Sequence, residues 1–133
     1  MSSIDIIVPV YRGLAETRAC LESVLKAKNV AVAEIVVIDD ASPEPEISRY
    51  LDQLAAQNRI TLLRNDSNRG FVVSCNRALA LHTDRDVVLL NSDTEVANDW
   101  LDRLLACAAA NPQAASISPF SNNATLCSYP RIG

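Results

Sequence analysis

A run of aliphatic residues leads directly into a polar triplet that ends in a carboxylate. Residues 87–90, VVLL, are followed at once by Asn91-Ser92-Asp93. Apolar runs of this kind are normally buried, whereas a carboxylate needs water, a hydrogen-bond donor or a cation. Two interpretations are open. The triplet is an ordinary exit from a strand into a loop, or the strand positions Asp93 for a ligand.

Polar residues also follow the other apolar segments of the chain. Pro9 to Gly13 follow the first segment, Asp39 and Asp40 end the second, and 64–66 follow the third. If the segments are parallel strands, these positions share the sheet edge where ligands bind. Clustered carboxylates repel each other unless a cation or donors are nearby, so the pattern indicates a metal ion or a polyhydroxylated ligand.

The spacing of apolar residues predicts the elements that would bring these positions together. Strand and helix patterns alternate, which predicts an α/β fold with a mostly parallel sheet flanked by helices on both faces. Ser42, before Pro43, and Asn98 are predicted helix caps, and His82 is expected to face solvent at the end of a helix. The strands are predicted at 4–8, 34–39, 60–63, 86–90 and 114–118, and the helices at 14–28, 43–54, 71–81 and 99–110.

Length and composition fit one globular domain that does not bind nucleic acid. The chain has 133 residues, 49% of them hydrophobic, and a formal net charge of −4. An acidic chain lacks the basic surface of a nucleic-acid binder. The sequence contains no signal-peptide pattern and no apolar segment near the roughly 20 residues of a membrane span. Its four cysteines are scattered, as expected for free, buried or half-buried thiols in the cytosol.

The usual phosphate-binding loops are missing. The chain has three glycines, and neither a P-loop nor a G-x-G-x-x-G motif follows the first predicted strand. Phosphates of a bound nucleotide would therefore need another partner. A divalent cation, Mg²⁺ or Mn²⁺, held by Asp93 is the natural replacement, since such ions prefer oxygen ligands and are often shared with substrate phosphates.

Four segments together closely resemble the family 2 glycosyltransferases of the GT-A fold. They are IIVPVYRG, EIVVIDDAS, LLRNDSNRGFVVSCNRAL and VVLLNSDTEV, in the family's order and spacing. The resemblance runs from about Ile4 to Trp100 and extends through SPFSNNATLCSYP. It implies a Rossmann-like GT-A half, that is, a single nucleotide-sugar-binding domain over 1–133 that lacks the C-terminal acceptor-binding part.

The resemblance also implies roles for individual residues in nucleotide binding. Pro9 and Tyr11 match positions that line the base pocket, although packing on a neighbouring loop is equally open for Tyr11. Asp39 and Asp40 match the paired acids that hold a uracil-type base and the ribose. Asp40 is favoured for the base contact, with Asp39 a near-equal alternative. The turn Asn68-Arg69-Gly70 matches the family's N-x-G turn beside the nucleotide.

The metal motif departs from the family at one position. Asn91-Ser92-Asp93 matches the D-x-D motif, but Asn91 replaces its first acid, while Asp93, the usual metal contact, is retained. For Asn122 and Asn123, both turn formation and contact with the donor remain open.

The implied reaction is inverting transfer of a sugar from a UDP- or dTDP-sugar to an acceptor hydroxyl. The acceptor would be a sugar or a lipid-linked glycan, in polysaccharide or cell-envelope synthesis. In this family the catalytic base lies downstream of the metal motif, and no acid follows Asp102 here. The base is therefore expected beyond Gly133, and the chain alone is expected to be inactive. The resemblance also implies a cytoplasmic location. It leaves open whether the full-length protein attaches to the inner face of the membrane.

Two other functions remain possible at this point. A sugar nucleotidyltransferase has a related layout but needs a glycine-rich loop after the first strand, where PVYRG offers one glycine. A non-catalytic nucleotide-binding domain would keep the fold without the chemistry. Apolar surface exposed by truncation is also expected to favour self-association.

Overall fold

The computed structural model describes residues 3–119. Four strands form one parallel sheet in the order β3-β2-β1-β4. The chain divides into one compact unit up to Asn98 and a second from Asp99, and each is described by itself. None of the helices in the described part is long and apolar enough to cross a membrane. The elements are β1 (Ile4–Val10), α1 (Leu14–Lys26), β2 (Val32–Asp39), α2 (Pro45–Ala56), β3 (Thr61–Arg64), α3 (Phe71–Leu79), β4 (Asp86–Leu89) and α4 (Trp100–Ala110).

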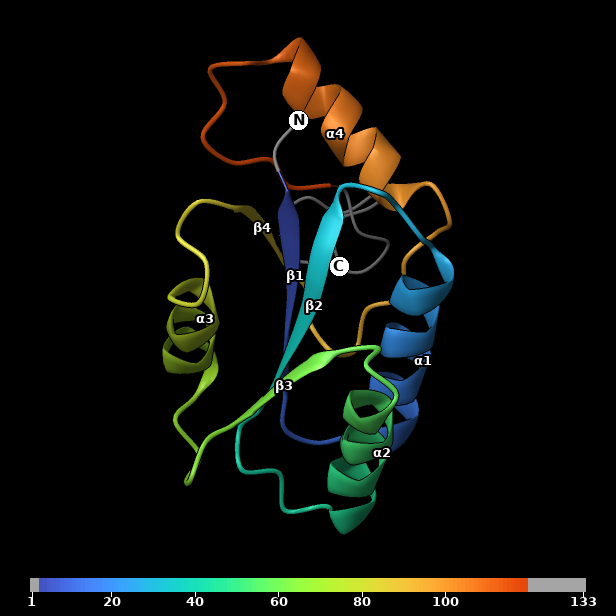
Figure 1. Cartoon of the computed structure of the whole chain (residues 1–133), viewed down its shortest axis with the longest axis vertical. Coiled ribbons are helices and arrows are strands. Elements are labelled where there is room, and N and C mark those ends of the chain that lie inside the picture. The colour runs from blue at the N-terminus through green and yellow to red at the C-terminus, as the bar shows by residue number, and fades with distance from the viewer. Residues whose placement is uncertain (1–2, 120–133) are drawn as a thin grey trace, which may run out of the picture. The chain divides into compact units, whose positions relative to one another are not determined.

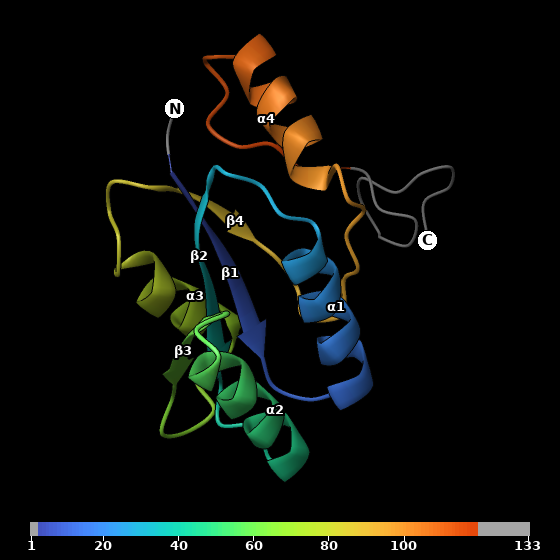
Figure 2. The same ribbon diagram turned by 45° about the vertical axis from the view of Figure 1, so that its right-hand side comes forward.

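The sheet of the first unit is covered on both faces, which confirms the predicted α/β fold. Helices α1 and α2 lie on one face and α3 lies on the other (Figures 1 and 2). The chain runs outward from β1 through β2 to β3, and α3 then brings it back past β1 to β4. This reversal places a topological switch point between β1 and β4, where open α/β sheets bind their ligands.

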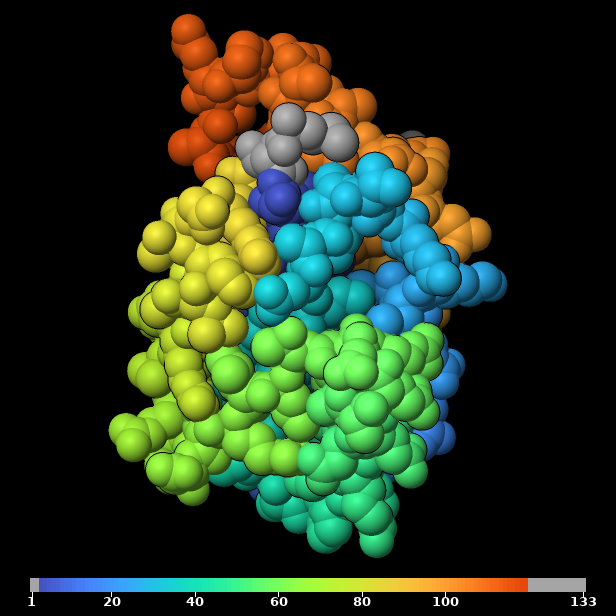
Figure 3. All heavy atoms as spheres, viewed as in Figure 1, coloured from blue at the N-terminus to red at the C-terminus, as the bar shows by residue number. Residues whose placement is uncertain are grey.

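Apolar side chains fill both faces of the sheet because successive residues of a strand point to opposite sides. On the α3 face, Ile7, Val36 and Ile38 form a core cluster with Ala78 of α3. The opposite face is covered by the buried residues of α1 and α2. Seen from one side, β1 is largely hidden behind the atoms of the neighbouring elements (Figure 3). Those buried helix residues include Cys20, Leu21, Val24, Ile47, Leu51 and Leu54.

Helix α2 begins later than predicted, and the prediction that Ser42 caps it is wrong. Glu44 occupies the N-cap position and Pro45 is the first helical residue. The N–H of Ser42 is already used by Asp39 Oδ1, at 2.8 Å, and its Oγ accepts the N–H of Glu44 at 3.2 Å. Because a residue before proline is driven out of the helical region, Glu44 is extended, with φ −96° and ψ 107°.

Two other predicted features differ in the second unit. Residues 114–118 form no strand, because the N–H of Ala114 bonds to the carbonyl of Asn111 at 2.9 Å and closes a turn after α4. The N-cap of α4 is Asp99 rather than Asn98. In the first unit, α3 ends at Leu79, two residues earlier than predicted.

The prediction that His82 faces solvent is also wrong. Its Nδ1 lies 2.7 Å from Oδ2 of Asp5, a buried residue on the α3 face of β1. Arg85 donates to the other oxygen of Asp5 at 2.8 Å and to Glu34 at 3.1 Å. A buried carboxylate is tolerated when donors satisfy it. This cluster therefore ties the segment between α3 and β4 to the amino-terminal end of the sheet.

The cysteines largely follow the prediction. Cys20 and Cys75 are free and buried, whereas Cys107 is free but exposed. Cys127 lies outside the described residues.

Strand β4 carries apolar side chains that stay accessible. Val87 and Leu89 pair in register with Asp5 and Ile7, so they lie on the α3 face of the sheet. They are 36% and 48% exposed. Such a surface is compatible with the expected self-association, which stays a prediction.

Shortening Leu51 should strongly destabilise the fold. Leu51 is completely buried, so Leu51→Ala should lower the free energy of unfolding by about 2–5 kcal/mol, through lost burial and a cavity. Val30 is 95% exposed, and Val30→Ala should change it by less than about 0.5 kcal/mol. Urea denaturation followed by circular dichroism measures both. Equal effects of the two substitutions would contradict this description of the core.

Candidate functional site

The pairing of β1 with β4 ends at a proline. The N–H of Leu90 bonds to the carbonyl of Ile7, and the N–H of Asp40 bonds to the carbonyl of Val10, both at 2.9 Å. Since backbone groups of successive residues face opposite neighbours, the nitrogen of Pro9 faces β4. Proline has no N–H to donate, so this ladder cannot continue past Leu90. The chain from residue 91 is thereby released from the sheet at the switch point.

The released segment forms a turn that is attached to α1. The N–H of Thr94 bonds to the carbonyl of Asn91 at 3.1 Å, and the Cys20 thiol donates to the same carbonyl at 3.6 Å. The N–H of Val96 bonds to Ser23 Oγ, also in α1, at 3.1 Å. The two ends of this segment are therefore held by side chains of one helix. Asn91 itself is exposed and Ser92 is half-buried.

The Cys20 thiol acts as a donor because it stays protonated. Burial raises the pKa of Cys20 to about 11; a hydrogen bond with the backbone of Thr94 opposes this, and the nearby charges of Asp93 and Glu95 raise it further. Those two charges show that the turn gathers negative potential beside the end of β4.

Asp93 has the properties of a ligand for a cation that is shared with a substrate. Its side chain is exposed, and it forms no hydrogen bond or ion pair within residues 3–119. Over the same residues, no group of three or more His, Cys, Asp or Glu side chains is placed to hold a metal ion. Mg²⁺ is often bound by one or two carboxylates, with phosphates and water completing its shell. Asp93 fits that arrangement and does not fit a metal site made of protein ligands alone.

The two acids at the end of β2 point to opposite faces of the sheet. Asp39 faces α2: its Oδ1 accepts the N–H of Ser42 at 2.8 Å, and its Oδ2 lies 3.4 Å from both Ser48 Oγ and Arg64 Nε. Asp40 faces α3. Strand alternation thus separates two carboxylates that are adjacent in the sequence.

Asp40 holds the turn before α3. Its Oδ1 accepts the N–H of Arg69 at 2.7 Å and the side-chain amide of Asn65 at 2.8 Å, and its Oδ2 accepts the N–H of Gly70 at 2.9 Å. Burial tends to raise the pKa of Asp40, but hydrogen bonds from Arg69, Asn65, Gly70 and Ser74 outweigh it. The pKa therefore lies below its usual range.

The turn itself needs glycine at its last position. Gly70 has φ +85°, a left-handed conformation that other residues rarely adopt, and its N–H also bonds to Asn68 Oδ1 at 3.1 Å. Asn65, which sequence reasoning missed, links the turn to α3 by donating to Ser74 Oγ at 2.9 Å. Its position directly after an apolar strand was the available signal.

The loop after β1 is fixed by a second carboxylate that sequence reasoning missed. The N–H of Gly13, at φ +86°, donates to Glu44 Oε2 at 2.9 Å. Tyr11 is half-buried, and the guanidinium carbon of Arg12 lies 5.2 Å from the centre of its ring. Glu44 therefore joins the loops that follow β1 and β2.

The structure brings some of the predicted site residues together and separates others. Asp40 lies with Arg69 and Gly70, whereas Asp39 is on the other face. Both acids are satisfied by protein donors, so neither requires the cation that carboxylate clustering had suggested. Asp93, which is exposed and has no hydrogen-bond or ion-pair partner within residues 3–119, is the acid of this edge that stays free for a cation. Asn122 and Asn123 lie outside the described residues.

Comparison with known proteins identifies the family. The sequence model for Glycosyl transferase family 2 matches residues 5–126. The chain belongs to the family 2 glycosyltransferases. The four segments that carried the resemblance all lie within this match, which ends four residues before the end of SPFSNNATLCSYP.

Two relatives illustrate the breadth of the similarity. The chain is 37% identical over 81 residues to polypeptide N-acetylgalactosaminyltransferase 4 of Caenorhabditis elegans, which covers 61% of this chain and 13% of the relative. It is 30% identical over 107 residues to the glucosyl-dolichyl phosphate glucuronosyltransferase of Haloferax volcanii, covering 80% of this chain and 33% of the relative. The chain thus spans well under half the length of either relative.

Solved glycosyltransferase structures confirm the GT-A fold. S. aureus TarS 1–349 in complex with UDP-GlcNAc superposes with a TM-score of 0.68 at 19% identity, over 90% of this chain and 38% of TarS 1–349. GalNAc-T7 with UDP, GalNAc and Mn²⁺ gives a TM-score of 0.71 at 21% identity, over 83% of this chain and 21% of GalNAc-T7.

Replacing Asp40 by Asn should weaken the fold in a pH-dependent way. Because the folded pKa lies below its usual range, the charge stabilises the protein above the unfolded pKa of about 3.9. At neutral pH, Asp40→Asn should lower the free energy of unfolding by roughly 1–3 kcal/mol, since buried N–H donors lose their acceptor. The difference should shrink as the pH falls below about 4.

Urea denaturation between pH 7 and pH 3 provides the measurement. Asp84→Asn is the matched control, because Asp84 is exposed and has no partner within residues 3–119. A pH-independent loss in Asp40→Asn would refute the role of the ionised carboxylate.

Proposed function

We propose that this chain forms the donor-binding part of a glycosyltransferase and binds a UDP- or dTDP-sugar with a divalent cation at Asp93. The observation that carries the proposal is the exposed, unpartnered carboxylate at the β1–β4 switch point, where Pro9 ends the ladder. TarS 1–349 has been solved with UDP-GlcNAc, and GalNAc-T7 with UDP, GalNAc and Mn²⁺, which supports this donor and ion class.

The nucleotide would lie along the carboxyl edge of the sheet. In this proposal Pro9 and Tyr11 line the base pocket, and Asn68-Arg69-Gly70 closes it. Asp40 already accepts three N–H groups, so its main contribution is to hold that turn. Ser74 also bonds to Asp40, so the roughly four lone-pair sites of its carboxylate are all in use, and a direct contact with the base would replace one of these donors. Asp39, on the α2 face, would act indirectly by holding the loop after β2 through the N–H of Ser42.

The cation site would be completed by the donor. Asp93 would bind Mg²⁺ or Mn²⁺, while Asn91 and Ser92 would lie beside the diphosphate. The bound ion would neutralise the diphosphate and make it a better leaving group. The chain's own contribution is to hold this turn against α1 through Cys20 and Ser23.

The wider reaction is proposed for the full-length protein. It would transfer the sugar with inversion to an acceptor sugar or a lipid-linked glycan, in polysaccharide or cell-envelope synthesis. We place it in the cytoplasm, with attachment to the inner face of the membrane still open. Support for these points is family membership and the short span of this chain relative to its relatives.

Binding of UDP should depend on both a metal and Asp93. Isothermal titration with UDP should give at least about tenfold tighter binding with Mn²⁺ than with EDTA, since the ion offsets repulsion between Asp93 and the diphosphate. Asp93→Ala should remove this gain. Asp84→Ala changes the charge equally at the amino-terminal end of β4 and should retain it. Metal-independent binding, or loss of binding in both variants, would refute the proposal.

The chain alone should bind donor without transferring sugar. Deprotonation of an acceptor hydroxyl needs a positioned base, and no Asp or Glu follows Asp102. Incubation with UDP-GlcNAc and a panel of acceptors, analysed by mass spectrometry, should therefore yield no glycosylated product. Product formation that is lost in Asp93→Ala would show that the base lies within this chain.

A further inference from the structure

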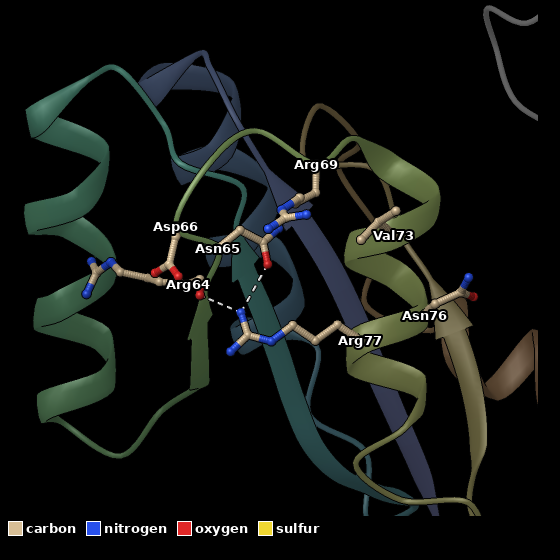
Figure 4. Close-up of a pocket in the computed structure, with 7 residues that line it drawn as sticks. All are labelled: Arg64, Asn65, Asp66, Arg69, Val73, Asn76 and Arg77. Carbon is tan, nitrogen blue, oxygen red and sulfur yellow. Dashed lines mark hydrogen bonds between the residues drawn. The ribbon is translucent and has the colours of Figure 1, made fainter.

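A hollow of about 580 Å³ lies between the loop after β3 and α3 (Figure 4). Every residue that lines it comes from the segment between Arg64 and Arg77. No residue of β1 or β4 contributes, and of the residues proposed to bind the donor only Arg69 belongs to the lining. Three arginines belong to its lining, which is notable in a chain whose formal net charge is −4.

Each nitrogen of the Arg64 guanidinium already has a partner. Its Nη1 bonds to Asp52 at 2.7 Å, its Nε lies 3.4 Å from Asp39, and its Nη2 donates to the carbonyl of Ser48 at 3.1 Å. In Figure 4 its side chain extends toward α2, away from the other labelled residues. Arg64 therefore forms part of the lining of the hollow, but its positive charge is already paired with Asp39 and Asp52.

Arg77 is fixed in place but has donors to spare. Its Nη1 donates to the carbonyl of Arg64 and to Asn65 Oδ1, the latter at 3.0 Å. Its Nε and Nη2 have no partner in the described part of the chain. Two bonds through one nitrogen hold the guanidinium still, so a ligand would not have to order this long side chain.

Arg69 contributes a second positive charge from the opposite side. Its backbone N–H is bound to Asp40, while its guanidinium has no partner within residues 3–119. Figure 4 shows the side chains of Arg69 and Arg77 reaching into the space between the loop and α3. Asp66 also lines the hollow, so Arg69, Arg77 and Asp66 together leave one net positive charge there.

We propose that this hollow binds the phosphate group of a ligand other than the sugar donor, through Arg69 and Arg77. Two guanidinium groups from different elements need an anion with oxygens in several directions. Phosphate meets this need, whereas a carboxylate offers two oxygens in one plane. Arginine binds phosphate well because its planar fork donates two parallel hydrogen bonds. The Arg69 side chain is thereby assigned to this hollow, and its backbone to the turn held by Asp40.

The test is a titration of the 133-residue chain with inorganic phosphate, followed by ¹H–¹⁵N NMR. Ionic strength is held constant because exposed charges are screened by salt. EDTA is present and nucleotide is omitted, which keeps the result independent of the proposed donor site. Phosphate should shift the Nε–H signals of Arg69 and Arg77 and the backbone signals of 64–77. Acetate at the same concentration should leave them unchanged.

Two substitutions in the hollow should change phosphate binding in opposite directions. Arg69→Gln should weaken phosphate binding about fivefold, and Asp66→Asn should strengthen it about threefold, as expected for partly exposed charges. Arg49→Gln is the matched control. It removes the same charge from an exposed position on α2 that has no partner within residues 3–119, and should alter binding less than about twofold. Asp93→Ala should bind phosphate as the unmodified chain does.

Several results would overturn the proposal. Equal weakening by Arg49→Gln and Arg69→Gln would indicate general attraction, and an unchanged Asp66→Asn would show that the hollow is not the site. Equal shifts with acetate would exclude the assignment to phosphate. Tighter binding in Asp93→Ala would place the phosphate at the donor edge instead, because without a cation the Asp93 carboxylate repels phosphate. If the site holds, parallel titrations with glucose 6-phosphate and with vesicles containing phosphatidic acid distinguish a soluble ligand from a lipid headgroup.

Discussion

The arrangement of this edge of the molecule depends on the buried carboxylate of Asp40. A buried charge without partners would be very costly, so the chain must present donors to it. The donors come from Asn65, Arg69 and Gly70, which lie 25 to 30 residues away in the sequence. Satisfying one carboxylate therefore determines the path of the loop after β3 and the start of α3. That path also brings Arg69, a residue of the turn, into the lining of the hollow.

At the switch point, the absence of a backbone N–H on Pro9 releases a segment of the chain from the sheet. Pro9 cannot extend the ladder to β4, so the chain beyond Leu90 leaves the sheet and turns beside α1. The carbonyl of Asn91 and the N–H of Val96 are then satisfied by Cys20 and Ser23. The result is an exposed carboxylate on a turn fixed at two points. A site shared with a metal-bound diphosphate requires this combination of accessibility and fixed position.

Acids serve different purposes along this one edge. Asp39, Asp40 and Glu44 accept hydrogen bonds from the loops and hold them in position. Asp93 accepts no such hydrogen bond within the described residues, so its carboxylate stays available to a cation. Their identical chemistry made them look like one cluster in the sequence. Their partners in three dimensions separate the three acids that hold loops from Asp93, the proposed cation ligand.

The sequence by itself determined the order of the elements, the two covered faces and the family. Hydrophobic periodicity is a local property, so segments such as 4–8 and 86–90 could be recognised without their neighbours. The position of Asp93 at a strand end followed from the same reasoning.

Only the tertiary structure decided which groups are partners. In the fold, Asp39 and Asp40 lie on opposite faces of the sheet, and His82 pairs with Asp5. Glu44, and not Ser42, occupies the N-cap position of α2, and residues 114–118 form no strand. The fold also bonds the backbone N–H of Arg69 to Asp40 and leaves the Arg69 guanidinium without a partner within residues 3–119. Each of these outcomes depends on hydrogen bonds or packing that a single segment does not contain, because a polar side chain takes the partner that folding brings to it.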